Sequence, residues 1–188
     1  MPNVSEARGI LNSADVLFTA EQVSAAVERM AAEITEKLGE TYPLVLSVMG
    51  GAVVFTGQLL PRLAFPLDFD YVHVSRYGDK TKGGELVWRQ APKEDVQDRV
   101  VLVLDDILDE GETMAAIRDR VLNMGAKAFY SGVFANKLIS KSKPIAADFV
   151  GIDVPDRYVF GYGMDVRGSW RNLLSNLCAE ISRSVPPT

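Results

Sequence analysis

One short stretch of the sequence carries most of the side chains that could do chemistry. It combines acids, a glycine and a hydroxyl in the order Asp105, Asp106, Ile107, Leu108, Asp109, Glu110, Gly111, Glu112 and Thr113. Carboxylates bind sugar hydroxyls and Mg²⁺, and glycine lets the backbone approach a phosphate closely. Acids that follow a strand are also common as solvated turn and cap residues. The whole pattern, more than the paired aspartates alone, favours a site for a phosphorylated sugar.

The residues on either side of this stretch predict the elements that hold it. Residues 101–104 are all aliphatic, which is typical of a strand covered on both faces in a parallel sheet. Apolar residues then recur at helical spacing over residues 114–124, and Gly125 ends the pattern. Ligands bind beyond the carboxyl ends of such strands, and helix N-termini favour anions. The turn between strand and helix is therefore expected to hold a phosphate.

A second unit of the same kind lies upstream. Residues 19–22 have the form of a capping box, and the apolar pattern that follows predicts a helix that ends at Gly39. Residues 44–49 form another aliphatic run, followed by Gly50, Gly51 and a helical pattern. Paired glycines expose successive N–H groups that bind an anion, but they also form ordinary tight turns. Both interpretations of this glycine turn remain open on these residues alone.

The remaining segments predict an α/β fold with a mainly parallel sheet. Strands and helices alternate from residue 44 onward, and further extended segments are expected at residues 67–74, 85–89, 128–135 and 148–154. The polar residues 76–84 are too many for a tight hairpin and form either a surface connection or a lid. The only histidine, His73, lies inside a predicted strand, where a structural role is favoured over a catalytic one.

Length and composition indicate one domain. The chain has 188 residues, of which 47% are hydrophobic, enough for one sizeable core. Its net charge of −5 argues against nucleic acid as a partner. The only cysteine, Cys178, excludes an internal disulfide and indicates a reducing compartment. Residues 1–18 lack a signal-peptide core, and no apolar run approaches the roughly 20 residues that span a membrane, so a cytoplasmic protein without membrane contact is expected.

Residues 101–113 resemble the 5-phosphoribosyl-1-diphosphate (PRPP) binding signature of the type I phosphoribosyltransferases. The resemblance implies the fold of that family, a mainly parallel central sheet flanked by helices with a small hood region. It implies a single domain over residues 1–188, with a core at about 40–165 and a hood built from the N-terminal segment and the residues after about 155. A strand that ends in two aspartates also resembles a Walker B segment, but no G-x-x-x-x-G-K-[ST] motif precedes it.

The resemblance assigns roles to the acidic stretch. It implies that residues 105–113 bind the ribose 5-phosphate part of PRPP, with Asp105 and Asp106 on the ribose hydroxyls. Asp109 is implied to be the catalytic acid–base at purine N7. Mg²⁺ is the implied cofactor, with metal contacts at Asp105, Asp106 and Asp165.

Two further loops receive roles in the same way. The family places a pyrophosphate-binding loop after its first core strand, which here is Met49, Gly50 and Gly51, and Arg171 matches a family arginine on the pyrophosphate. Family members often carry lysine where this chain has Met49, so only backbone contacts are expected there. The lid loop of the family corresponds to the segment that begins with Arg76 and Tyr77.

Residues 154–165 resemble the purine-recognition region of the 6-oxopurine branch, the hypoxanthine-guanine phosphoribosyltransferases. The resemblance implies that Lys137 binds the purine O6 and that Tyr158 stacks on the base. Backbone carbonyls of Val159 and Asp165 would accept from N1–H and a 2-amino group, and Asp165 is also expected to reach a second Mg²⁺. Each side chain alone has an ordinary structural explanation, and only the joint match favours a base site.

The expected activity is purine salvage. The resemblance implies transfer of the 5-phosphoribosyl group from PRPP to N9 of hypoxanthine or guanine, giving IMP or GMP and pyrophosphate. A homodimer or homotetramer is expected by the same analogy. Two alternatives remain open: a xanthine-preferring enzyme, and a non-catalytic regulator on this fold that binds nucleotide or RNA.

Overall fold

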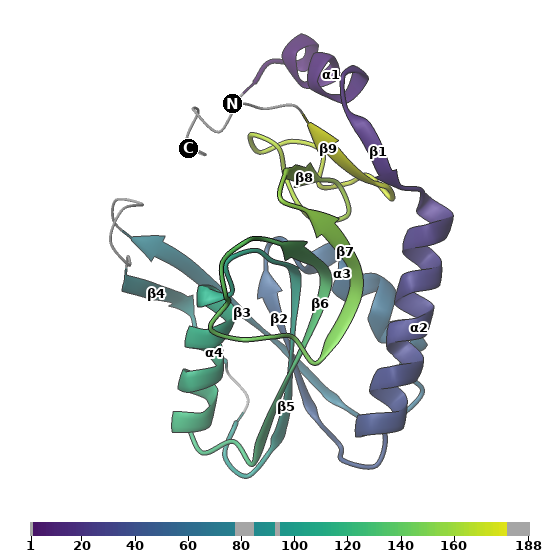
Figure 1. The fold of residues 1–188 in the computed structure, drawn as a ribbon. Helices are drawn as coiled ribbons and strands as arrows, with labels where there is room; N and C mark the ends of the chain where they lie inside the picture. The colour runs from purple at the N-terminus through teal and green to yellow at the C-terminus, as the bar shows by residue number, and fades with distance from the viewer. Residues whose placement is uncertain (1, 78–84, 93–94, 180–188) are drawn as a thin grey trace.

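A computed structural model of the protein describes residues 2–77, 85–92 and 95–179. Its core is a six-stranded sheet in the order β4-β3-β2-β5-β6-β7. The strands are parallel except for β4, which pairs antiparallel with β3. The predicted α/β fold with a mainly parallel sheet is confirmed (Figure 1). The strands are β2 (Leu44–Met49), β3 (Asp68–Tyr77), β4 (Glu85–Gln90), β5 (Val100–Leu108), β6 (Ala128–Leu138) and β7 (Phe149–Pro155).

Helices cover both faces of this sheet (Figure 1). One face packs against α2 (Ala20–Leu38) and α3 (Val53–Leu59), which a short 3-10 turn (Leu60–Arg62) extends, and the other packs against α4 (Glu112–Asn123). Leu102 and Leu104 of β5 belong to the first core cluster, whereas Val101 and Val103 belong to the second. Because side chains alternate along a strand, an all-aliphatic strand serves two apolar layers. This layering confirms the predicted burial of β5 on both faces.

A second, smaller sheet lies above the carboxyl ends of the large sheet (Figure 1). It consists of β1 (Asp15–Phe18), β9 (Asn176–Ala179) and β8 (Tyr158–Phe160) in the order β1-β9-β8, all antiparallel. The N-terminal helix α1 (Val4–Asn12) joins it through Trp170, whose Nε1 donates to the Ala7 carbonyl at 2.7 Å. The chain thus brings its N-terminal segment and residues 158–179 together over the carboxyl ends of the strands of the large sheet.

Several strands extend further than the sequence pattern predicted. Strand β5 continues to Leu108, so Asp105 and Asp106 lie in the strand and not after it, because Asp105 pairs with Val133 of β6. The turn is correspondingly shorter, and α4 begins at Glu112. Strand β6 likewise includes Lys137. Backbone pairing across the sheet overrides the change from aliphatic to polar residues.

The predicted lid segment also begins within a strand. Arg76 and Tyr77 end β3, where they pair with Leu86 and Glu85 of β4, so the prediction that the loop begins at residue 76 is wrong. Antiparallel pairing with β4 holds these two residues in the sheet. Residues 78–84 of the predicted lid lie outside the described residues, as does the tail predicted over residues 182–188. Within the described part of the chain, no helix is both long and apolar enough to cross a membrane.

Candidate active site

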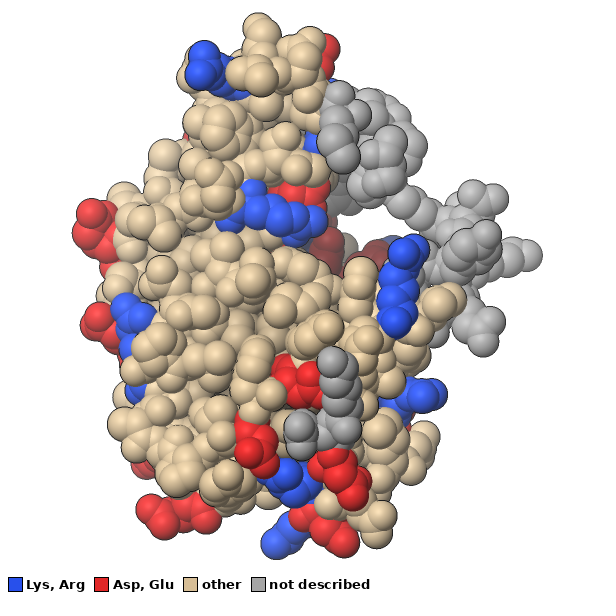
Figure 2. Space-filling model, turned by 180° about the vertical axis from the view of Figure 1, so that it is seen from behind, with Lys and Arg blue, Asp and Glu red and all other residues tan. Residues whose placement is uncertain are grey.

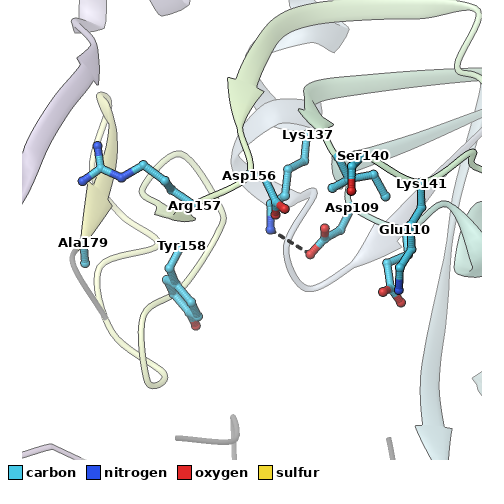
Figure 3. A pocket seen from close by; sticks show the side chains of 10 residues that line it. Asp109, Glu110, Lys137, Ser140, Lys141, Asp156, Arg157, Tyr158 and Ala179 are labelled. Carbon is cyan, nitrogen blue, oxygen red and sulfur yellow. Dashed lines mark hydrogen bonds and ion pairs between the residues drawn. The ribbon is translucent and has the colours of Figure 1, made fainter. Parts of the chain in front are cut away.

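Two adjoining pockets lie at the carboxyl ends of β5 and β6, and they share Asp109 and Glu110. The first, of about 440 Å³, is lined by Asp109, Glu110, Lys137, Ile139, Ser140, Lys141, Asp156, Arg157, Tyr158 and Ala179 (Figure 3). The second, of about 300 Å³, is lined by Asp105, Ile107, Leu108, Asp109, Glu110, Gly111, Thr113 and Met114. The acidic stretch and the residues predicted to contact a base therefore border one continuous region.

Asp109 and Lys137 form an ion pair at the boundary between the two pockets. The distance from Lys137 Nζ to Asp109 Oδ2 is 2.8 Å, and the lysine side chain is only 13% exposed. Leu108 and Asn136 are register partners in parallel strands, so the residues that follow them leave the sheet side by side. Figure 3 shows this pair on one side of the first pocket, with Arg157 and Tyr158 on the other.

The turn before α4 has the backbone geometry that the sequence predicts. Gly111 is the N-cap of α4 and adopts φ 81°, a left-handed conformation that glycine adopts without steric cost. No side chain caps this helix end. The first turn of a helix presents N–H groups and a partial positive charge, and Thr113 in that turn lines the second pocket. The helix end of the second pocket is thus suited to an anion, whereas Asp105, Asp109 and Glu110 elsewhere in its lining are acidic.

Asp105 and Asp106 form a close pair of partly buried carboxylates next to this turn. The Asp106 N–H donates to Asp105 Oδ1 at 2.9 Å. Burial raises the pKa of Asp105 well above its usual value, and the charge of Asp106 raises it further. Burial also raises the pKa of Asp106, against the opposing influence of Asp105 and Arg171. Both carboxylates would gain from hydroxyl donors or a cation in this place.

Three segments meet at Asp106 with no space between them. A Cβ atom at Gly51, in the turn after β2, would overlap the Asp106 carboxylate, and a Cβ atom at Gly163 would overlap the Gly51 carbonyl oxygen. The Met49–Gly50 peptide in the same turn is cis. Arg171 borders this junction, since its Nη1 donates to the Gly163 carbonyl at 2.6 Å. The glycine turn predicted for an anion is therefore in contact with the acidic stretch.

Apart from Lys137 of β6, the residues predicted to contact a base come from the small sheet and the loop that follows β8. Tyr158 lines the first pocket, and its hydroxyl donates to the Asp165 carbonyl at 3.2 Å. Burial is the main cause that raises the pKa of Tyr158. Both carboxylate oxygens of Asp165 are engaged, one with Arg171 Nη2 at 2.5 Å and one with the Gly168 N–H at 2.7 Å. Val159 is buried and pairs with Cys178 in the small sheet.

Several lining residues were not predicted from the sequence. They are Ile139, Ser140, Lys141, Asp156, Arg157 and Ala179. Asp156 and Arg157 lie beside Tyr158 in the segment already selected, so their position was a usable signal. Ala179 carries no such signal, because it reaches the pocket only by pairing with Tyr158 across the small sheet. His73 is exposed in β3, and Cys178 is buried, where its thiol donates to Asp15 Oδ2 at 3.9 Å.

Charged side chains of both signs are mixed over the face of the molecule that Figure 2 shows. Figure 2 shows acidic and basic groups side by side in the recess where the smaller upper part of the molecule meets the larger lower part. An anionic ligand would thus meet local cationic groups in a chain whose net charge is −5.

A family model described as the phosphoribosyl transferase domain matches residues 13–167 of this chain. The chain belongs to the phosphoribosyltransferase family. The hypoxanthine-guanine phosphoribosyltransferase of Bacillus subtilis is 33% identical over 159 residues, which cover 84% of this chain and 88% of that protein. The hypoxanthine-guanine-xanthine phosphoribosyltransferase of Tritrichomonas foetus is 31% identical, with coverage of 84% and 87%.

Solved structures of this phosphoribosyltransferase family share the fold. A hypoxanthine phosphoribosyltransferase from Staphylococcus aureus superposes with a TM-score of 0.85 at 25% identity, covering 96% of each chain. The predicted type I phosphoribosyltransferase fold is confirmed by this match. The protein is accordingly an enzyme of the phosphoribosyltransferase family that resembles the hypoxanthine-guanine members.

Proposed function

We propose that this phosphoribosyltransferase transfers the 5-phosphoribosyl group of PRPP to N9 of hypoxanthine or guanine, releasing pyrophosphate and forming IMP or GMP. The observation that carries the proposal is the Asp109–Lys137 ion pair at 2.8 Å, where the acidic stretch meets a lysine of the neighbouring strand. Relatives named for 6-oxopurines cover 84% of the chain and support the same substrate class.

The first pocket is the proposed base site. The Lys137 ammonium can donate only, so it suits the O6 acceptor of a 6-oxopurine and not the amino group of adenine. Tyr158 offers an aromatic face on the opposite side of this pocket (Figure 3). The backbone carbonyls of Val159 and Asp165 are the proposed acceptors for N1–H and the guanine 2-amino group.

The second pocket is the proposed sugar-phosphate site. Asp105 and Asp106 would hold the ribose hydroxyls, and the backbone of residues 109–113 with the Thr113 hydroxyl would hold the 5-phosphate at the start of α4. The turn formed by residues 49–51, together with Arg171, would hold the pyrophosphate through backbone N–H groups and a guanidinium fork.

The proposed reaction breaks the bond from ribose C1 to pyrophosphate and forms the bond from C1 to purine N9. C1 gains positive character as the pyrophosphate leaves, which the nearby carboxylates favour. The purine gives up a proton when N9 attacks, and Asp109 accepts it at N7. When Lys137 binds the purine O6, its ion pair with Asp109 would open, and the Asp109 carboxylate would be free to accept this proton.

Mg²⁺ is the proposed cofactor, and the donors present are suited to it. Mg²⁺ usually keeps several waters and binds one or two carboxylates together with substrate phosphates. Asp105 and Asp106 offer such a pair, while no three acid, histidine or cysteine side chains of the described residues gather into a metal site. Substrate oxygens would thus complete the coordination. Asp165 is the proposed ligand of a second Mg²⁺, and each of its engaged oxygens retains a lone pair. When bound, the metal would neutralise charge on the departing pyrophosphate.

We also propose the domain organisation and the oligomeric state from the family resemblance. The chain would act as a single domain, with the small sheet and α1 as a hood over the site edge of the large sheet. A cytoplasmic homodimer or homotetramer is expected, and sedimentation equilibrium would measure its size.

The decisive experiment is an initial-rate assay with PRPP, Mg²⁺ and each of hypoxanthine, guanine, xanthine and adenine. Hypoxanthine and guanine should react fastest, and adenine should be rejected. A xanthine preference would favour the alternative specificity, as in the name of the Tritrichomonas foetus relative. An adenine preference would contradict the role of Lys137. Pyrophosphate release with none of the four bases would overturn the proposed function.

A further inference from the structure

Lys143, in the loop between β6 and β7, links the ends of the two strands that carry the ion pair. Its Nζ donates to the Leu108 carbonyl of β5 at 2.6 Å and to Asn136 Oδ1 of β6 at 2.8 Å. Leu108 immediately precedes Asp109, and Asn136 immediately precedes Lys137. The Lys143 ammonium therefore hydrogen-bonds to the residue before Asp109 and to the residue before Lys137.

The link continues into the third strand. Asn136 Nδ2 donates to Asp153 Oδ1 of β7 at 2.7 Å, which turns the amide oxygen of Asn136 toward Lys143. The carbonyl of Leu108 and the side chain of Asn136 lie at the last register pair of β5 and β6. The Lys143 ammonium therefore adds a side-chain connection between β5 and β6 at their last register pair.

The stem of the same side chain contacts the phosphate turn. A Cβ atom at Gly111 would lie 3.3 Å from Lys143 Cβ, so the lysine stem lies directly against the left-handed N-cap of α4. Partial burial lowers the pKa of Lys143, while the Asp109 charge opposes this change and the Lys137 charge adds to it. The side chain is thus partly withdrawn from water between the two halves of the site.

We propose that Lys143 is a positioning residue that fixes the distance between the Asp109 turn and Lys137, so that the phosphosugar and the purine are held in register for transfer. Lys143 is not among the described residues that line either pocket, so it acts through Leu108, Gly111 and Asn136. The inference rests on the proposed function. A displacement of about 1 Å at a reacting centre can reduce a rate by about 100-fold, so a single misplaced strand end has a large effect.

The first test compares three lysine variants in the intact protein. Lys143→Met removes the ammonium and keeps the stem, Lys143→Arg keeps a charged donor, and Lys127→Met removes an exposed lysine near the start of β6 as the matched control. We expect Lys143→Met to lose about 10- to 100-fold in kcat/KM with hypoxanthine and PRPP. Lys143→Arg should recover part of this loss, and Lys127→Met should match the wild type.

Binding measurements separate positioning from a general loss of structure. IMP spans both halves of the proposed site, whereas ribose 5-phosphate occupies one half. Calorimetry on Lys143→Met should therefore show a larger loss of affinity for IMP than for ribose 5-phosphate. Equal losses for the two ligands would overturn the positioning role.

A double variant tests the route through Asn136. If Lys143 acts through this amide, Lys143→Met combined with Asn136→Leu should lose less activity than the product of the two single losses. Independent, multiplicative losses would overturn the proposed link. If Lys143→Met melts below the assay temperature, the activities of Lys143→Arg and Asn136→Leu are compared with that of Lys127→Met in its place.

The test also separates this inference from the proposed function. A wild type active on a 6-oxopurine, together with a Lys143→Met variant as active as Lys127→Met, would overturn the role of Lys143 alone. A wild type with no activity on any of the four bases would overturn the proposed function and this inference with it.

Discussion

The two halves of the candidate site are built in different ways. The sugar-phosphate half is one continuous stretch, residues 105–113, held by pairing of β5 with strands on both sides and by the start of α4. The base half is assembled from the end of β6, from β8 and from the loop that follows it. That loop is held by local backbone hydrogen bonds and by side-chain bonds such as those from Tyr158 to the Asp165 carbonyl and from Arg171 to the Gly163 carbonyl, not by pairing in the large sheet. Substitutions in the first half should abolish transfer, whereas those in the second should adjust it.

The largest expected effect is at Asp109, where the two halves meet. Asp109→Asn keeps the shape of the side chain but removes its ability to take a proton. We expect turnover to fall by about 10²- to 10⁴-fold while much of the PRPP affinity remains. Steady-state kinetics and PRPP titration would measure the two effects separately.

Asp119→Asn is a suitable control for that measurement, because Asp119 is an exposed residue of α4 that pairs with Arg118 at 2.8 Å. It should retain wild-type kinetics. Wild-type turnover in Asp109→Asn would show that the proton goes elsewhere.

The same contrast explains how much the sequence could predict. The sugar-phosphate half was recognisable because its residues are contiguous and lie between a strand pattern and a helix pattern. The end of β5 was placed too early, since the strand continues to Leu108 through pairing with residues far along the chain. Polar residue types alone do not report such pairing.

The base half was much less predictable from residue patterns. Lys137 and Tyr158 were selected only by resemblance to a family. The strands of the small sheet are three or four residues long, too short for a periodic signal. Lys143 gives no signal at all, because its role depends on a carbonyl and an amide from two other strands.

The second prediction concerns the contact between Gly51, in the turn after β2, and Asp106 of the sugar-phosphate half. Gly51→Ala would push a Cβ into the Asp106 carboxylate, so the turn or the acid must move. We expect a loss of about 1–3 kcal/mol in the free energy of unfolding, together with reduced activity. Urea denaturation and the hypoxanthine assay would measure both.

Gly57→Ala provides the matched control in the adjacent helix. A Cβ at Gly57 has no neighbouring atom within 4 Å, and alanine is the better helix former, so stability should rise by about 0.5–1 kcal/mol. Equal stabilities for the two variants would mean that the contact between Gly51 and Asp106 is loose in solution.

The third prediction is the pH dependence of stability due to Asp105. Burial and the Asp106 charge raise the pKa of Asp105 in the folded protein, so folding favours its protonated form. The stability contributed by this group is fully present below the ordinary aspartate pKa of about 4 and is lost as pH rises through the raised pKa. Asp105→Asn should therefore be more stable than the wild type at neutral pH, by on the order of 1 kcal/mol, although inactive.

Denaturant unfolding between about pH 5 and about pH 8 would test this sign. Asparagine keeps the oxygen that accepts from the Asp106 N–H, so the local hydrogen bond is preserved. The advantage of Asp105→Asn should grow with pH. A constant difference would mean that Asp105 ionises as easily in the folded protein as in the unfolded chain.

The smallest expected effect is on stability, in a comparison of two tyrosines of the base half. The Tyr162 hydroxyl is buried without a hydrogen-bond partner among the described residues, and burial raises the pKa of Tyr162 to about 12. Its ring packs on Phe134 at 4.3 Å between centroids, which phenylalanine would preserve. Tyr162→Phe should thus leave stability unchanged or raise it by up to about 1 kcal/mol.

Tyr158→Phe is the matched variant, since it removes a hydroxyl that donates to the Asp165 carbonyl. It should cost about 0.5–1.5 kcal/mol, measured by thermal unfolding alongside Tyr162→Phe. If both variants lose stability equally, the Tyr162 hydroxyl has a partner such as a bound water. The base half would then be held to the core by more than packing, and the contrast between the two halves of the site would be smaller than their protein contacts indicate.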